Sequence, residues 1–261
     1  MSHAEAMPDL VREFCKVTRL PHDPFAKEFL NRCRSHTIKV NGRFYKFFQS
    51  GKGPTVLLVH GVNANLGSMV TMADELLGQG YRVVLFDVAG HGEALGAAAV
   101  DPGEIRDLLR GIYDRIADLH AVICHSMGGL WALSAWHGEL NAKALVSISS
   151  PASMMFLVEK FAELHALEGD QVQELIGQIG NCFGKDVWAT YSPAEVVKTI
   201  NVPGLIIHGA ADAYVPPAHA KDLHAGWPQA NMELIEGAGH FDIMESLQVR
   251  SLVSAYLREA R

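Results

Sequence analysis

Short, continuously apolar runs alternate along most of this chain with segments whose apolar residues recur at helical spacing. Runs of this kind are typical of strands that are buried on both faces of a parallel sheet. The segments between them have the apolar stripe of helices that pack on such a sheet, and Asp101-Pro102 has the cap and first-turn proline of a helix start. Strand and helix in alternation predict an α/β protein with a doubly wound, mostly parallel sheet. The runs occupy residues 55–60, 81–86, 121–125, 144–149 and 203–208, and residues 231–236, which mix apolar and polar residues, are predicted as a further strand.

The N-terminal part of the chain follows a different pattern. Residues 35–48 place β-favouring side chains on both sides of Asn41-Gly42, the dipeptide most typical of a tight hairpin turn. We therefore expect an antiparallel hairpin at the start of the sheet. Residues 1–35 mix a few apolar positions with two prolines, and we expect a helical or irregular N-terminal extension there, whose role the sequence leaves open.

One connection is longer than an α/β crossover requires. Between the run at 144–149 and the strand that begins near Val202 there are about fifty residues, which is more than a crossover helix and its loops need. We predict that residues 154–199 form a small helical cap. The cap would be inserted into a core made of residues 36–153 and 200–261.

The first cap helix is unusually apolar where it begins, at Met154, Met155 and Phe156. Such a face is by default part of the core, but flexible methionine side chains are also suited to line a binding surface. We take these three residues as candidates for substrate binding. If they contact the substrate, its acyl or alcohol group is apolar.

The apolar run at 121–125 stops at Ser126 and is followed by small residues. To present a hydroxyl above the end of a strand, the chain must turn sharply into a helix, in a backbone conformation that bulky neighbours would block. Gly128 and Gly129 meet that need and let the following helix lie close to the sheet. Cys124 stands where the common G-x-S-x-G pattern has its first glycine, a replacement that keeps the side chain small. The stretch predicts a nucleophile elbow.

Three more motifs accompany the elbow. Residues 57–62 are an apolar strand that ends in His-Gly-Val, residues 209–216 read Gly-Ala-Ala-Asp-Ala-Tyr-Val-Pro, and residues 237–241 read Gly-Ala-Gly-His-Phe. Together with the elbow they resemble the α/β-hydrolase superfamily, in its serine esterase and lipase-like branch, where serine, aspartate and histidine follow in this order. A serine at the elbow argues against the haloalkane dehalogenase and epoxide hydrolase branches, which use an aspartate there.

The resemblance implies a role for each motif. Ser126 would be the nucleophile, His240 the base that takes its proton, and Asp212 the carboxylate that orients and stabilises the imidazole. The backbone N–H groups of Val62 and Met127 would bind the developing oxyanion. Taken singly, each side chain is also compatible with an ordinary role: a serine at a helix N-terminus, an aspartate in a turn and a histidine in a loop.

Composition disfavours several other classes of function. The chain of 261 residues carries a net charge of −7 and has no run of lysine and arginine, so neither nucleic acid nor an anionic membrane surface is an expected partner. No stretch approaches the roughly 18 apolar residues of a membrane span, and residues 1–9 lack the pattern of a secretory signal. We therefore expect no membrane span and a cytoplasmic location. The four cysteines lie far apart and His60, His91 and His125 lie in separate turns, so we expect free thiols and no metal site.

The sequence as a whole predicts a serine hydrolase that needs no cofactor. It would cleave the carboxylic ester of a small to medium, largely apolar molecule through an acyl-enzyme. A carbon–carbon bond hydrolase, or a thioesterase or lactonase, could use the same motifs. A ligand-binding receptor with little turnover is the alternative from a different class. The physiological substrate and the oligomeric state are not determined by the sequence.

Overall fold

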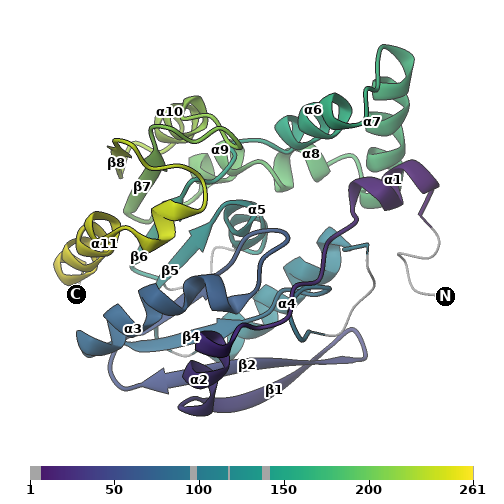
Figure 1. The fold of residues 1–261 in the computed structure, drawn as a ribbon. Coiled ribbons are helices and arrows are strands. Elements are labelled where there is room, and N and C mark those ends of the chain that lie inside the picture. Colours follow the sequence, from purple (N-terminus) through teal and green to yellow (C-terminus); the bar gives the residue numbers. More distant parts are fainter. Residues whose placement is uncertain (1–6, 95–98, 117, 137–141, 261) are drawn as a thin grey trace.

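A mixed sheet forms the centre of the molecule in a computed structural model that describes residues 7–94, 99–116, 118–136 and 142–260. Its eight strands stand in the order β1-β2-β4-β3-β5-β6-β7-β8 (Figure 1). The pairs β1/β2 and β2/β4 are antiparallel and the other neighbours are parallel, which confirms the mostly parallel, doubly wound sheet. The strands are β1 (Arg34–Val40), β2 (Arg43–Gly51), β3 (Thr55–Val59), β4 (Arg82–Phe86), β5 (Leu119–His125), β6 (Ala144–Ile148), β7 (Gly204–Gly209) and β8 (Ala230–Ile235).

Burial of the strands follows their place in the sheet. Every residue of the central strands β3, β5, β6 and β7 is buried, because helices cover both faces there. The edge strand β1 alternates toward its end between exposed and buried positions. Between β1 and β2, Asn41 and Gly42 have φ values of 48° and 82°, the left-handed conformations that a two-residue hairpin turn needs. The predicted hairpin is confirmed.

Two helical layers enclose the sheet, with one apolar cluster on each face. On one face lie α3 (Val70–Gly78) and α11 (Leu247–Glu259), preceded by the short turns η2 (Leu66–Met69) and η4 (Asp242–Glu245). The other face is covered by α4 (Pro102–Arg115), α5 (Met127–Ser134) and α10 (Ala218–Ala225). Asp101 caps α4 as expected, since its carboxylate accepts a hydrogen bond of 2.8 Å from the N–H of Gly103. Because β4, β3, β5, β6, β7 and β8 run parallel, their carboxyl ends lie along one edge of the sheet.

The remaining helices belong to the connection between β6 and β7 and to the N-terminal segment. Between β6 and β7 the chain forms α6 (Met154–Leu164), α7 (Asp170–Phe183), α8 (Val187–Thr190), α9 (Pro193–Val196) and η3 (Val197–Thr199). The N-terminal segment contains α1 (Asp9–Phe14) and α2 (Pro24–Asn31), and α1 packs against α7 (Figure 1). That residues 154–199 form a cap separate from the core stays a prediction. Within the described ranges, no helix is both long and apolar enough to cross a membrane.

Candidate active site

Ser126 sits in the sharp turn between β5 and α5. Its backbone has φ 54° and ψ −128°, a conformation that a non-glycine residue adopts only when its surroundings enforce it. Two hydrogen bonds hold the turn: the N–H of Ser126 donates to the carbonyl of Ile148 at 2.9 Å, and the N–H of Gly129 donates to the carbonyl of Ser126 at 2.9 Å. The hydroxyl is therefore presented at the end of the strand on a strained backbone, as a nucleophile elbow requires.

The residues around Ser126 are small because the sheet is very close. A Cβ atom on Gly128 would lie 2.5 Å from the carbonyl oxygen of Val59 and 2.7 Å from that of His60, both of which are backbone atoms. Cys124, which replaces the first glycine of the pattern, is fully buried, and burial raises the pKa of its thiol to about 12. The thiol is therefore neutral, and it donates a hydrogen bond to the carbonyl of Val146 at 3.3 Å.

The close contact at Gly128 leads to a prediction with an internal control. We expect Gly128→Ala to lower the free energy of unfolding by about 1–3 kcal/mol, because rigid backbone must move to admit the methyl group. Gly177 lies in α7, and apart from its chain neighbours and the backbone of its own helix no atom lies within 4 Å of the place that an added methyl group would take, so Gly177→Ala should raise the free energy of unfolding by about 0.5–1 kcal/mol. Urea unfolding measures both changes. If the free energy of unfolding changed in the same direction in both variants, this account of the elbow would be contradicted.

Three side chains from separate loops form a continuous hydrogen-bonded chain at this point. His240, in the loop after β8, places its Nε2 atom 2.9 Å from Ser126 Oγ. Its Nδ1 atom lies 2.7 Å from Oδ2 of Asp212, which is in the loop after β7. All three side chains are buried. With the ring proton on Nδ1, this nitrogen donates to the carboxylate while Nε2 is free to accept the serine proton.

The surroundings of Asp212 keep its carboxylate ionised. Its Oδ1 atom accepts hydrogen bonds from the N–H groups of Tyr214 at 2.9 Å and Val215 at 2.8 Å. Burial by itself raises the pKa of Asp212, but the hydrogen bonds from His240, Val215 and Tyr214 outweigh it and leave the pKa below its ordinary value. A negative charge is thus fixed behind the imidazole of His240.

Two neutral histidines support the loops that carry His240 and Asp212. His125 Nε2 lies 2.9 Å from the carbonyl oxygen of His240, and burial lowers the pKa of His125 to about 4, so the ring is neutral and donates this hydrogen bond. His208 in β7 donates in the same way to the carbonyl of Val215 at 2.8 Å, and burial lowers its pKa as well. Sequence reasoning missed the role of His208, because its partner is a backbone carbonyl that no motif reveals.

The loop after β3 passes directly beside the serine. A Cβ atom on Gly61 would lie 3.0 Å from Ser126 Cβ, so a larger residue would press on the nucleophile. His60 shapes this loop: its Nδ1 donates to the carbonyl of Gly61 at 2.7 Å, and its Nε2 accepts from the N–H of Val88 at 3.0 Å. In the described part of the chain, the backbone N–H groups of Val62 and Met127 have no protein acceptor.

Two neighbouring cavities surround this site. The active-site cavity, of about 810 Å³, is lined by Ser126, His240 and Phe156 among others. A second cavity of about 250 Å³, called the side pocket from here on, is lined by Met154. Met155 lines neither of these two cavities. Successive helix residues point about 100° apart, so three consecutive side chains cannot all face one pocket, and substrate binding by Met155 stays a prediction. The residues that line both cavities are Val62, Asn63, Met127 and Leu157.

The described residues show no metal-binding arrangement. No group of three or more histidine, cysteine, aspartate or glutamate side chains among them is placed to hold an ion. The histidines at 60, 91 and 125 instead bond to backbone groups of nearby loops.

Several known proteins have sequences similar to parts or most of this chain. A family model described as "Serine aminopeptidase, S33" matches residues 52–180. A proline iminopeptidase from Xylella fastidiosa is 42% identical over 61 residues, which are 23% of this chain and only 19% of that relative. The dihydrolipoyllysine-residue acetyltransferase component of the acetoin cleaving system of Pseudomonas putida is 26% identical, with 85% of this chain and 68% of that one covered. Esterase YbfF from Escherichia coli is 23% identical, with 78% and 92% covered.

Solved structures share the whole fold. An esterase from Pyrococcus furiosus superposes with a TM-score of 0.71 at 19% identity, covering 94% of this chain and 97% of that one. An esterase from Exiguobacterium antarcticum gives a TM-score of 0.66 at 19% identity, with 86% and 100% covered. The sheet order, the strained serine turn and the superpositions on solved esterases together show that the chain has the α/β-hydrolase fold.

Proposed function

We propose that this protein is a serine hydrolase that cleaves the carboxylic ester of a small to medium, largely apolar substrate through an acyl-enzyme intermediate. The observation that carries the proposal is the continuous chain from Ser126 Oγ through His240 to Asp212, at 2.9 Å and 2.7 Å, beside a cavity of about 810 Å³. A fold shared with solved esterases supports it, and so do relatives that are named as esterases.

In the first half of the proposed reaction, Ser126 becomes acylated. Its Oγ attacks the ester carbonyl carbon while the hydroxyl proton passes to Nε2 of His240, and the carbonyl electrons move onto oxygen. The N–H groups of Val62 and Met127 donate to that oxyanion. Collapse of the intermediate breaks the bond to the alcohol oxygen, which takes the proton from His240. Asp212 stabilises the imidazolium that exists in between.

In the second half, water takes the place of the alcohol. His240 removes a proton from water as it attacks the acyl carbon, and the same proton then returns to Ser126 Oγ as the acid leaves. Each step uses only side chains and backbone groups of this chain, so the proposed mechanism involves no cofactor.

The lining of the active-site cavity favours an apolar alcohol or acyl group. It includes Phe156, Leu157, Leu164, Phe241 and Met244, which offer no hydrogen bond to a polar substrate. The carboxylate of Glu163, which also lines the cavity, is paired with Lys160 at 2.7 Å.

An aminopeptidase is the second candidate, because of the family model and the proline iminopeptidase segment. A free substrate amine would need a carboxylate, and Glu245 lines the active-site cavity. L-Prolyl p-nitroanilide compared with p-nitrophenyl butyrate separates these two candidates. Acyl-CoA thioesters, lactones and ring-cleavage diketones in the same panel test the thioesterase, lactonase and carbon–carbon hydrolase alternatives.

The experiment that tests the proposal is active-site labelling of the intact protein. A fluorophosphonate should add one phosphonyl group, which peptide mapping should locate on Ser126, because only a hydroxyl activated by a neighbouring base reacts readily. The same reaction in denaturing urea is the control and should give no adduct. A folded protein that forms no adduct, or forms it on another residue, would overturn the proposal and favour a ligand-binding receptor.

A further inference from the structure

The side pocket borders the active site where a substrate carbonyl would lie. Val62 and Met127, whose N–H groups are proposed to hold the carbonyl oxygen, line both the side pocket and the active-site cavity. A substrate bound by these groups has its carbonyl carbon next to Ser126 Oγ. One of its two remaining substituents can therefore extend into the side pocket.

The position of His240 decides which substituent that is. His240 must protonate the leaving alcohol, so the alcohol has to lie on the side of the imidazole. Among the described residues, His240, Tyr214 and Phe241 line the active-site cavity and not the side pocket. The alcohol thus belongs in the larger cavity, and the acyl chain is directed into the side pocket.

The side pocket is suited to a hydrocarbon chain. Two of its polar groups are already engaged: Lys16 is paired with Glu13 at 2.9 Å, and Asn63 Oδ1 accepts from the N–H of Thr18 at 2.6 Å. Burial raises the pKa of Cys15 to about 12, so its thiol adds no charge. The rest of the lining is apolar or aromatic and includes Phe14, Val17, Leu130, Trp131, Met154 and Phe161.

One wall of this pocket comes from the N-terminal segment and not from the sheet or its helices. Residues 14–22, called the strap from here on, contribute Phe14 to Val17. The Phe14 ring lies edge-on to Phe161 of α6 with centroids 5.4 Å apart. The carbonyl of Cys15 accepts a hydrogen bond of 2.8 Å from the N–H of Val100. The strap therefore bridges α6 and the segment before α4.

Polar contacts fasten the strap to the loop that carries Val62. Besides the bond between Thr18 and Asn63, the side-chain amide of Asn65 donates to the carbonyl of Leu20 at 3.1 Å and to that of Pro21 at 3.2 Å. The same asparagine accepts from Gly67 N–H and begins η2. These hydrogen bonds thus fix the position of the pocket wall relative to the proposed oxyanion loop.

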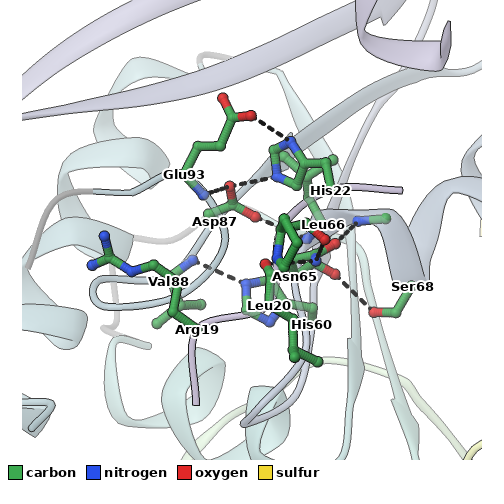
Figure 2. Close-up of polar contacts among 12 residues, drawn as sticks. Arg19, Leu20, His22, His60, Asn65, Leu66, Ser68, Asp87, Val88 and Glu93 are labelled. Carbon is green, nitrogen blue, oxygen red and sulfur yellow. Dashed lines mark hydrogen bonds and ion pairs between the residues drawn. The ribbon is translucent and has the colours of Figure 1, made fainter. Parts of the chain in front are cut away.

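A buried pair closes the C-terminal end of the strap. His22 Nε2 lies 2.8 Å from Asp87 Oδ2, and its Nδ1 lies 3.5 Å from a carboxylate oxygen of Glu93 (Figure 2). Asp87 also accepts from the N–H groups of Leu66 and Glu93, both at 2.9 Å. The hydrogen bond to Asp87 raises the pKa of His22 although burial opposes it. Removing either partner would leave the other buried without its counterpart, so this end of the strap is firmly anchored.

We propose that the strap is a specificity element that, with the side pocket, receives a linear, apolar acyl chain of medium length. The proposal rests on the proposed esterase function. An apolar cavity of about 150 Å³ holds one benzene ring, so 250 Å³ holds roughly six to ten chain carbons. Phe14 and Val17 set the size of the pocket from the strap side, while the alcohol occupies the active-site cavity.

The first test narrows the pocket with Val17→Phe. kcat/KM is measured on p-nitrophenyl acetate, butyrate, octanoate and laurate, after fluorophosphonate labelling has shown that the variant is folded and active at Ser126. We expect a loss of about 10- to 100-fold on octanoate, because the ring takes the space of the chain. Acetate, which is too short to enter the pocket, should be hydrolysed at close to the wild-type rate.

The second test enlarges the pocket and has a matched control. Phe14→Ala should shift the preference from octanoate toward laurate, by about fourfold for each further methylene that becomes buried. Phe25 also lies in the N-terminal segment, but its ring is exposed and lines neither cavity. Phe25→Ala should therefore leave the chain-length profile unchanged. A profile that is the same in Phe14→Ala and Val17→Phe as in the wild type contradicts the proposal.

A binding measurement separates this proposal from the proposed function. Sodium octanoate should raise the Tm of the wild type more than that of Val17→Phe, whereas sodium acetate should not distinguish them. If Ser126 forms the adduct and octanoate raises the Tm of the wild type and of Val17→Phe equally, the esterase assignment stands and the acyl site lies elsewhere. Without an adduct the esterase assignment fails, and the octanoate shifts still decide whether the side pocket binds an acyl chain.

Discussion

Ser126→Ala should lower kcat/KM for a p-nitrophenyl ester by about 10⁴- to 10⁶-fold, the loss that removal of the nucleophile causes in serine hydrolases. His240 and Asp212 have no function in acyl transfer without the hydroxyl that lies 2.9 Å from His240 Nε2. The variant should therefore lose as much activity as Ser126→Ala combined with His240→Ala. This non-additivity is the sign that the residues act as one unit.

Ser134→Ala is the matched control for this measurement. Ser134 is a buried serine on α5, the helix that begins directly after Ser126, and its hydroxyl donates to the carbonyl of Trp131 at 2.8 Å. The substitution removes the same kind of hydroxyl from the other end of this helix, so kcat/KM should stay near the wild-type value. Thermal denaturation should first show that both variants are folded. A loss of kcat/KM below about tenfold in Ser126→Ala would then rule out Ser126 as the nucleophile.

The features that the sequence predicts correctly depend on local pattern. The central parallel strands are apolar runs because both of their faces are covered, and the hairpin turn needs only the two residues Asn41-Gly42. The residues expected to form the site lie in loops directly after strands. Since parallel strands end at the same edge of a sheet, Ser126, Asp212 and His240 come together once the sheet is formed.

The features that the sequence does not predict depend on single long-range contacts. Thr18 bonds to Asn63 across 45 residues, and His22 to Asp87 across 65 residues. Such contacts leave no periodic signal, so the extension could not be assigned a place or a role. Helix α10 was not predicted because only Ala220 and Leu223 of it are buried, too few to form an apolar stripe.

Asp212→Asn should lower kcat about 10⁴-fold while leaving the site assembled. The asparagine side-chain oxygen can still accept from the N–H groups of Tyr214 and Val215, but its NH₂ group then points toward His240. An imidazole that must accept at Nδ1 carries its proton on Nε2, where it cannot take the proton of Ser126. The fluorophosphonate reaction should slow in parallel, since it uses the same proton transfer.

The stability of this variant carries an independent check on the carboxylate. Because the pKa of Asp212 lies below its ordinary value in the folded protein, its ionised form stabilises the fold above the unfolded-state pKa of about 3.9. That contribution is lost as the pH falls through the folded-state pKa. Wild type should therefore exceed Asp212→Asn in free energy of unfolding at pH 7, and the difference should shrink on acidification below about pH 4.

Asp222→Asn makes the same change of charge at an exposed position on the neighbouring helix α10. It should leave both kcat and the pH dependence of stability near those of the wild type. If Asp212→Asn retained kcat within about tenfold of wild type, the imidazole of His240 would not depend on a fixed negative charge for its tautomer, and Asp212 would be only a turn residue. If kcat falls only in Asp212→Asn, and the difference in free energy of unfolding between this variant and the wild type shrinks at low pH, both effects are assigned to one buried carboxylate.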